Sequence, residues 1–248
     1  MTEKKSRMKT AVGEWVPQYI PNRMVSGIMG FLSLFKTAKR KVKENRENNY
    51  HLLVEKEYSK ETRQFFTPGA YIENQAQWGK VCFGKKYTMA YGGCEIFAVY
   101  NALVALEQEP DGRALMDLIS KFERKGAVLA GYLGSAPKAA YHYFRELGYQ
   151  VKVVTRRDEA AINQLGEEYE TVIATVYNDG HDIFRMIHTV NISKDEQGCY
   201  HGHNCYKRGK NAKGEMTYVS HGPHRTLWDA VSAMSGGTAE VLLVMGIR

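Results

Sequence analysis

Cysteine is scarce in this chain, and long apolar runs are missing. The 248 residues include only four cysteines, too few for a disulfide scaffold, so we expect a reducing, cytoplasmic location. The longest apolar stretch, 24–35, is shorter than the roughly 20 residues that span a bilayer. It also lacks the small-residue cleavage site of a secretory signal and runs into a basic cluster. We therefore predict neither a transmembrane helix nor a signal peptide.

Excess charge is missing from most of the chain and is confined to one end. Residues 1–66 hold 14 Lys and Arg against 7 Glu, which accounts for the whole net charge of +7. Residues 67–248 are therefore neutral, which argues against a nucleic-acid partner for the body of the protein. A turn signal, Thr67-Pro68-Gly69, marks the expected boundary. We predict a basic N-terminal arm over 1–66 and one globular domain over 67–248.

The arm contains one amphipathic segment, at 23–47, which we predict to be helical. Met24, Ile28, Phe31 and Phe35 form an apolar stripe, and a run of Lys and Arg follows it. Such a helix either lies on an anionic membrane surface or packs on the body of its own protein. Both possibilities stay open at this point.

The order of elements in the body predicts an α+β fold, with a helical half packed on an antiparallel sheet. Helical periodicity and capping residues come first, including Asp158 as an N-cap and Pro137 after an expected N-cap at Ser135. Alternating, β-branched segments dominate afterwards. The expected elements are an extended segment at 70–78, a helix from Cys94, helices at 113–124, 136–147, 158–166 and 227–234, and strands at 149–155, 172–177, 185–192, 198–206, 217–220 and 241–247.

Cys94 follows Gly92-Gly93, at the first turn of the predicted helix. The two glycines allow a sharp turn and leave room for another chain to approach. The unpaired N–H groups and the positive end of the helix dipole then face the sulfur and favour its thiolate. A small buried hydrophobic cysteine is the alternative interpretation.

His188 is the histidine whose context suggests a catalytic base. It lies mid-strand and shares one face with Met186, Val190 and Ile192, so its ring needs a partner or a function. A base that activates a cysteine also needs an orienting group. We expect Asn204, on the neighbouring strand, to accept the imidazole N–H through its side-chain amide oxygen.

The same stretch offers a rival metal site made of Cys199, His201, His203 and Cys205. A strand rises about 3.3 Å per residue, so the outer two ligands would be about 20 Å apart and cannot share one ion. Two neighbours together with His221 or His224 would be needed. The spacing matches no tight zinc motif, so we predict no metal and no cofactor.

Five short motifs occur together in residues 70–248. They are Glu73-Asn74-Gln75-Ala76-Gln77-Trp78-Gly79, Gly92-Gly93-Cys94, Gly131-Tyr132, Phe144-Arg145-Glu146-Leu147-Gly148-Tyr149 and His188-Thr189-Val190. The order of these motifs resembles that of papain-like cysteine peptidases of the bacteriocin-processing, double-glycine leader peptidase type. The resemblance implies a papain-like fold, no cofactor and a peptide or protein substrate, and we expect a monomer.

The resemblance also implies roles for single residues. Cys94 would be the nucleophile, His188 the general base and Asn204 the third member. Gln75, or alternatively Gln77, would supply an oxyanion donor beside the backbone N–H of Cys94. Gly93, Glu95 and Gln77 are the expected substrate contacts.

The chain departs from the family after the nucleophile. The family usually has Gly and Pro there, whereas Glu95-Ile96 follow here, so Glu95 either opposes the thiolate or touches a substrate amine. Hydrolysis through a thioester is the first hypothesis. Acyl transfer, as in a transglutaminase, and a non-catalytic peptide-binding relative are the alternatives.

Overall fold

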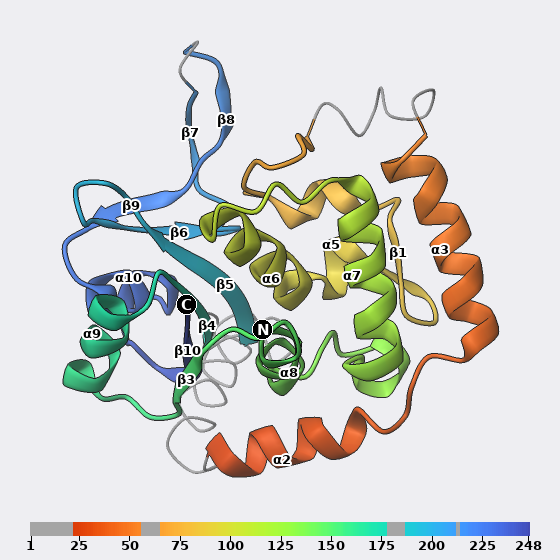
Figure 1. Ribbon diagram of the computed structural model, residues 1–248, viewed down its shortest axis with the longest axis horizontal. Coiled ribbons are helices and arrows are strands. Elements are labelled where there is room, and N and C mark those ends of the chain that lie inside the picture. The colour runs from red at the N-terminus through yellow and green to blue at the C-terminus, as the bar shows by residue number, and fades with distance from the viewer. Residues whose placement is uncertain (1–21, 56–64, 178–186, 212–213) are drawn as a thin grey trace, which may run out of the picture.

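The computed structural model describes residues 22–55, 65–177, 187–211 and 214–248. In these residues eight α-helices pack against a six-stranded antiparallel sheet, so the mixed α+β prediction is confirmed (Figure 1). The strand order is β3-β10-β4-β5-β6-β9. Its strands are β3 (Val151–Val154), β4 (Thr171–Tyr177), β5 (Ile187–Lys194), β6 (Tyr200–His203), β9 (His221–His224) and β10 (Val241–Ile247).

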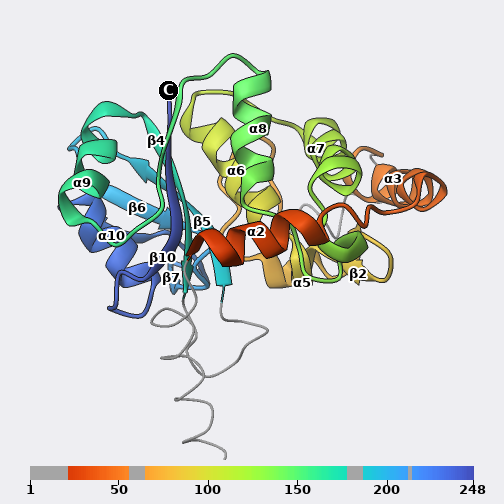
Figure 2. The same ribbon diagram turned by 90° about the horizontal axis from the view of Figure 1, so that it is seen from below.

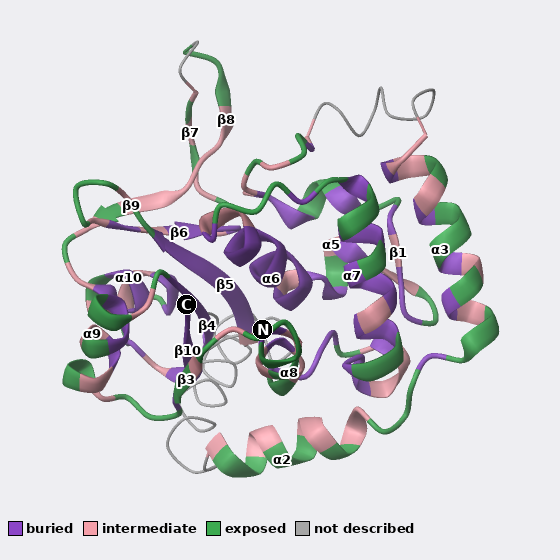
Figure 3. Ribbon diagram, in the orientation of Figure 1, coloured by how far each residue is buried: buried purple, intermediate pink, exposed green. Residues whose placement is uncertain are grey.

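Both faces of the sheet are covered by helices. On one face Val172, Val190 and Ile192 pack with α9 (Glu159–Glu168) and α10 (Leu227–Met234). On the other face Ile173 and Met245 pack against α6 (Cys94–Ala105), which is almost wholly buried. Figure 3 shows the buried residues concentrated in β4, β5, β10 and α6. The sheet is therefore a central layer between two helical layers.

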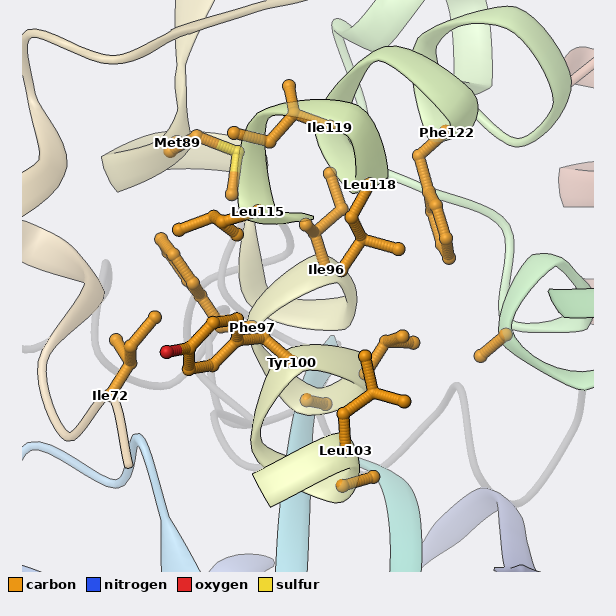
Figure 4. Close-up of a cluster of buried hydrophobic side chains, with 14 of the residues drawn as sticks. Ile72, Met89, Ile96, Phe97, Tyr100, Leu103, Leu115, Leu118, Ile119 and Phe122 are labelled. Carbon is orange, nitrogen blue, oxygen red and sulfur yellow. The ribbon is translucent and has the colours of Figure 1, made fainter. Parts of the chain in front are cut away.

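Helix α6 is the centre of the larger hydrophobic core. Its Phe97 and Tyr100 face residues of α7 (Gly112–Lys125), including Leu115 and Ile119 (Figure 4). Nine of its twelve residues are buried, which excludes water from nearly its whole length. This layer also contains α5 (Met89–Gly92) and α8 (Lys138–Glu146). A helix packed on all sides holds its first residue, Cys94, in a fixed place.

Most predicted elements are present, with shifted ends. The predictions for α6, α7, α9, α10 and β10 are confirmed, and the Asp158 side chain accepts a hydrogen bond from the Ala161 N–H as expected of an N-cap. The strand predicted at 198–206 is shorter, because Asn204 and Tyr206 adopt positive φ values and end it. The sequence did not predict η2 (Val128–Gly131), β1 (Cys82–Phe83), β2 (Tyr87–Thr88), β7 (Arg208–Lys210) or β9.

Two further predictions are wrong. The segment predicted to be extended at 70–78 ends in a 3-10 helix, η1 (Gln75–Trp78), capped by the Asn74 side chain. The N-cap of α8 is Pro137 and not Ser135. Its first turn is instead capped from another helix, because the Glu95 carboxylate accepts the Ala140 N–H at 3.0 Å.

The segment predicted as one helix at 23–47 forms two. Helix α2 (Asn22–Leu32) is followed by a break and then by α3 (Lys39–Leu53), which packs on α7. Figure 2 shows α2 crossing from the sheet to the helical half. In the described residues no helix is long and apolar enough to cross a membrane. The predicted boundary at residue 67 stays a prediction, and residues 1–21 lie outside the described part.

Candidate active site

Cys94 begins α6, and its sulfur lies among hydrogen-bond donors. The Thr189 backbone and side chain and the backbone of Glu95 and of Cys94 itself favour the thiolate, so they act to lower the pKa of the thiol. Burial raises the pKa of the Cys94 thiol above its ordinary value, and the Thr189 contacts lower it in part. In the resting protein Cys94 therefore carries a neutral thiol at pH 7, held where a thiolate would find ready donors.

Glu95 points into the protein and not into an open site. Its side chain is 1% exposed, and one carboxylate oxygen accepts the Ala140 N–H while the other has no partner. Burial raises the pKa of Glu95 well above its ordinary value. A raised pKa favours the uncharged form of Glu95 and so weakens its opposition to a thiolate at Cys94. This position supports a capping role for Glu95 and leaves no surface for a substrate amine.

Gly93 is required by internal packing. A Cβ at this position would meet the Met89 carbonyl oxygen at 2.5 Å and the Met89 methyl at 2.7 Å. Gly93 is also the N-cap of α6, and its carbonyl oxygen accepts the Phe97 N–H. The missing side chain therefore makes room for α5, whose position fixes the approach of the chain to Cys94. Its expected contact with substrate stays a prediction.

His188 is held by Asn204, but not through the expected atom. The His188 Nε2 lies 2.9 Å from the main-chain carbonyl oxygen of Asn204. A carbonyl oxygen only accepts hydrogen bonds, so Nε2 carries the proton and Nδ1 keeps its lone pair. Burial lowers the pKa of His188, which is 8% exposed, so the ring is neutral at pH 7. The ring of Tyr206 stacks on it at 5.6 Å.

The Asn204 side chain is committed to Gln75. Its Oδ1 accepts the Gln75 backbone N–H at 2.8 Å, and its Nδ2 donates to the Gln75 Oε1 at 3.0 Å. The Gln75 Nε2 donates to the Ala90 carbonyl, in the helix directly before Cys94. Gln77, in contrast, is exposed, because η1 turns it away from Gln75. Asn204 thus links three of the four predicted catalytic residues, namely itself, His188 and Gln75.

The Cys94 sulfur lies next to Thr189 of β5, which directly follows His188 in the strand. Thr189, which contacts the Cys94 sulfur, also hydrogen-bonds the Thr175 hydroxyl on the α6 face of the sheet. Side chains alternate along a strand, so His188 leaves the backbone on the other side. Among the described residues no hydrogen bond joins the Cys94 sulfur to the His188 ring. Direct pairing of Cys94 and His188 stays a prediction.

A second polar chain lies beside Asn204 and was not predicted. The His203 Nδ1 is 2.7 Å from a Glu73 carboxylate oxygen, and its Nε2 is 2.8 Å from the Ser193 hydroxyl. Tyr71 stacks on the His203 ring at 3.7 Å. The second Glu73 oxygen accepts the Asn204 N–H. Glu73 thereby positions the residue whose carbonyl holds His188. Its place two residues before Gln75 was the available sequence signal.

The other histidines near β6 have partners of their own. His201 pairs with Asp195 at 2.7 Å, and His221 pairs with His224 at 2.9 Å. In the described part of the chain no three His, Cys, Asp or Glu side chains are grouped so as to hold a metal ion. His181, near the start of β5, lies outside the described residues.

A groove of about 310 Å³ opens beside Cys94. One wall comes from the body of the protein, where Leu133, Ile187 and Thr189 give it a mainly apolar lining. The other wall is the inner side of α2, with Val25, Met29 and Leu32. Cys94 is therefore partly buried under a segment of its own chain.

Comparison with known proteins does not assign the chain to a family. No family model, no curated protein and no solved structure matches it.

Proposed function

We propose that this protein is a cysteine peptidase with a papain-like fold, cleaving a peptide amide through a thioester on Cys94. The main support is the link between His188, Asn204 and Gln75 at the end of the sheet where α6 begins with Cys94. These residues are far apart in the sequence, and they meet in the order expected from the resemblance.

The tautomer of His188 suits a general base. Because Nε2–H is donated to the Asn204 carbonyl, Nδ1 is the free acceptor for the thiol proton. The proposed step moves that proton to Nδ1 while the sulfur attacks the amide carbon, and the C=O electron pair moves to oxygen. On collapse the C–N bond breaks, the amine leaves with the proton, and a thioester remains. Water then hydrolyses the thioester.

The oxyanion of this step needs donors that are already in place. The Cys94 backbone N–H, at the start of α6, is one candidate donor. The Gln75 amide is the second, since its hydrogen bond to the Ala90 carbonyl holds it next to the turn before Cys94. The tethered position of Gln75 favours it over the exposed Gln77 as the residue that contributes to catalysis.

A non-catalytic peptide-binding protein is the second candidate function. Two observations favour it: the sulfur contacts Thr189 and not the His188 ring, and burial raises the pKa of the thiol. In such a protein the groove would bind a peptide without cleaving it. The two candidates differ in whether substitution of Cys94 abolishes the chemistry or leaves the function intact.

The deciding experiment is cleavage of a mixed peptide pool, with new termini identified by mass spectrometry. The wild-type protein and the α2 variant Met29→Glu are both assayed, because α2 lies over the groove. We expect cleavage that is lost in Cys94→Ala and reduced about 10²-fold or more in His188→Gln, the range for losing a general base. Cys82→Ala, which removes a free thiol with no role in the proposed site, serves as the control and should keep full activity. Absence of any Cys94-dependent cleavage in both proteins would contradict the proposal.

A further inference from the structure

The groove beside Cys94 has one wall made by a helix of the same chain. Helix α2 contributes Val25, Ile28, Met29 and Leu32 to its lining, and the body contributes the surface around Cys94. Val25 and Met29 also pack, as Ile187 does, against Tyr177 and Leu242 at the end of the sheet. The apolar inner side of α2 therefore forms one side of the groove in which a bound peptide would lie beside Cys94.

The attachment of α2 is concentrated at its two ends. At the first residue, the Asn22 amide donates to the Val241 carbonyl at 2.7 Å and to the Thr155 carbonyl at 3.0 Å, and Asn22 accepts the Tyr177 hydroxyl at 3.1 Å. Beyond the last residue, the Phe35 carbonyl accepts the Ala130 N–H at 2.6 Å. Between these points no residue of α2 is buried. A helix tied at both ends and loosely packed between them can leave its groove without unfolding the core.

The side of α2 that faces away from the groove is apolar too, and the groove-lining Ile28 is itself 53% exposed. Met24 and Phe31 are 53% and 61% exposed, although they are as apolar as the inner residues. Phe31 packs only edge-on against Phe35 among the ring contacts of the described residues. The helix therefore presents two apolar faces, of which one lies on the groove and the other lies in solvent.

We propose that α2 is a displaceable wall of the Cys94 groove, which restricts access to the sulfur until a peptide with apolar side chains takes its place. This inference rests on the proposed function for the nature of the incoming peptide. The restriction of access by α2 stands on its own. When α2 leaves, Leu133, Ile187 and Tyr91 remain as an apolar surface beside the sulfur. Apolar residues of a peptide would cover that surface as Val25 and Met29 do.

The test measures chemical access to Cys94 rather than catalysis. Each of the four cysteines is followed by iodoacetamide labelling and peptide mapping in the full-length protein. Met29→Glu places a carboxylate in the groove, and we expect it to raise the Cys94 labelling rate about tenfold by populating the open form. Phe31→Glu, on the outer side of the same helix, is the matched control and should change the rate less than about twofold.

A second variant guards against misfolding of the first. Asn22→Ala removes the tie at the start of α2 and should raise Cys94 labelling several-fold, with Cys82, Cys199 and Cys205 unchanged. The proposal is overturned if Cys94 labels at the wild-type rate in both Met29→Glu and Asn22→Ala, or if Phe31→Glu or the other cysteines respond equally. Faster Cys94 labelling without peptide cleavage would support the proposed role of α2 and contradict the proposed peptidase activity. Cleavage with unchanged labelling would support the peptidase activity and contradict the proposed role of α2.

Discussion

Helices α2 and α3 come from the same basic arm, yet they are attached to the protein in opposite ways. Helix α3 buries Val42, Asn45, Asn49 and Leu53, whereas α2 buries no residue. The Asn49 side chain exchanges two hydrogen bonds with the backbone of Cys82, so α3 also fixes the β1–β2 hairpin. The composition of a helix does not show whether it is part of the core. Helix α3 is the more polar of the two, and yet it is the one that belongs to the core. What decides is whether its polar side chains find buried partners.

The largest expected difference between the two helices is in their response to pH. Asn45 of α3 donates to the Glu123 carboxylate, which also accepts the Gly84 N–H, and burial raises the pKa of Glu123 to about 7. A carboxyl group with a raised pKa binds more protons in the folded state, so stability is full below pH 4.5 and falls as pH rises to about 7. The expected loss is about 3 kcal/mol.

The measurement is urea denaturation across this pH range in the wild type and in Glu123→Gln. The variant keeps an acceptor for Asn45 and Gly84 but has no proton to lose, so the difference between the two proteins should shrink at low pH. Parallel curves for the two proteins would mean that Glu123 is not the group that couples α3 to pH.

Glycine substitutions sharpen the comparison at a smaller scale. A Cβ at Gly112, at the start of α7, would collide with the Leu53 carbonyl of α3, while a Cβ at Gly27 of α2 would meet nothing within 4 Å. Gly112→Ala should therefore lower the free energy of unfolding by about 2 kcal/mol. Gly27→Ala should favour the helical form of α2 by up to about 1 kcal/mol, which slows Cys94 labelling about fivefold. If both substitutions stabilised the structure, or both destabilised it, α2 and α3 would not differ in how tightly they are packed.

The sequence predicted the elements better than it predicted their contacts. Periodicity and capping residues located α7, α9 and α10, because local chemistry sets those boundaries. The break between α2 and α3 depends on which part of the protein each helix packs against. No local sequence pattern carries that information. The same holds for Glu95, whose capping partner Ala140 lies 45 residues away. The cap expected at Ser135 was wrong for this reason.

In the candidate site, residue identity was more predictable than atomic role. The sequence placed Asn204 next to His188, and the structure agrees on the pair. It is the main-chain carbonyl that holds the ring, since the positive φ of Asn204 turns the backbone toward His188 and leaves the amide to Gln75. Glu73 and His203 lay in segments already under consideration. Only the three-dimensional contact revealed that Glu73 positions Asn204.

The central claim is that the Cys94 thiol and the His188 ring act on each other. The most direct measurement is the pH titration of the His188 ring protons by NMR, in the wild type and in Cys94→Ala. Burial keeps the pKa of His188 below its ordinary 6.5 in both proteins. A neutral Cys94 thiol that donates to Nδ1 stabilises the neutral ring, so its removal should raise that pKa. Identical titration curves for the two proteins would contradict the account.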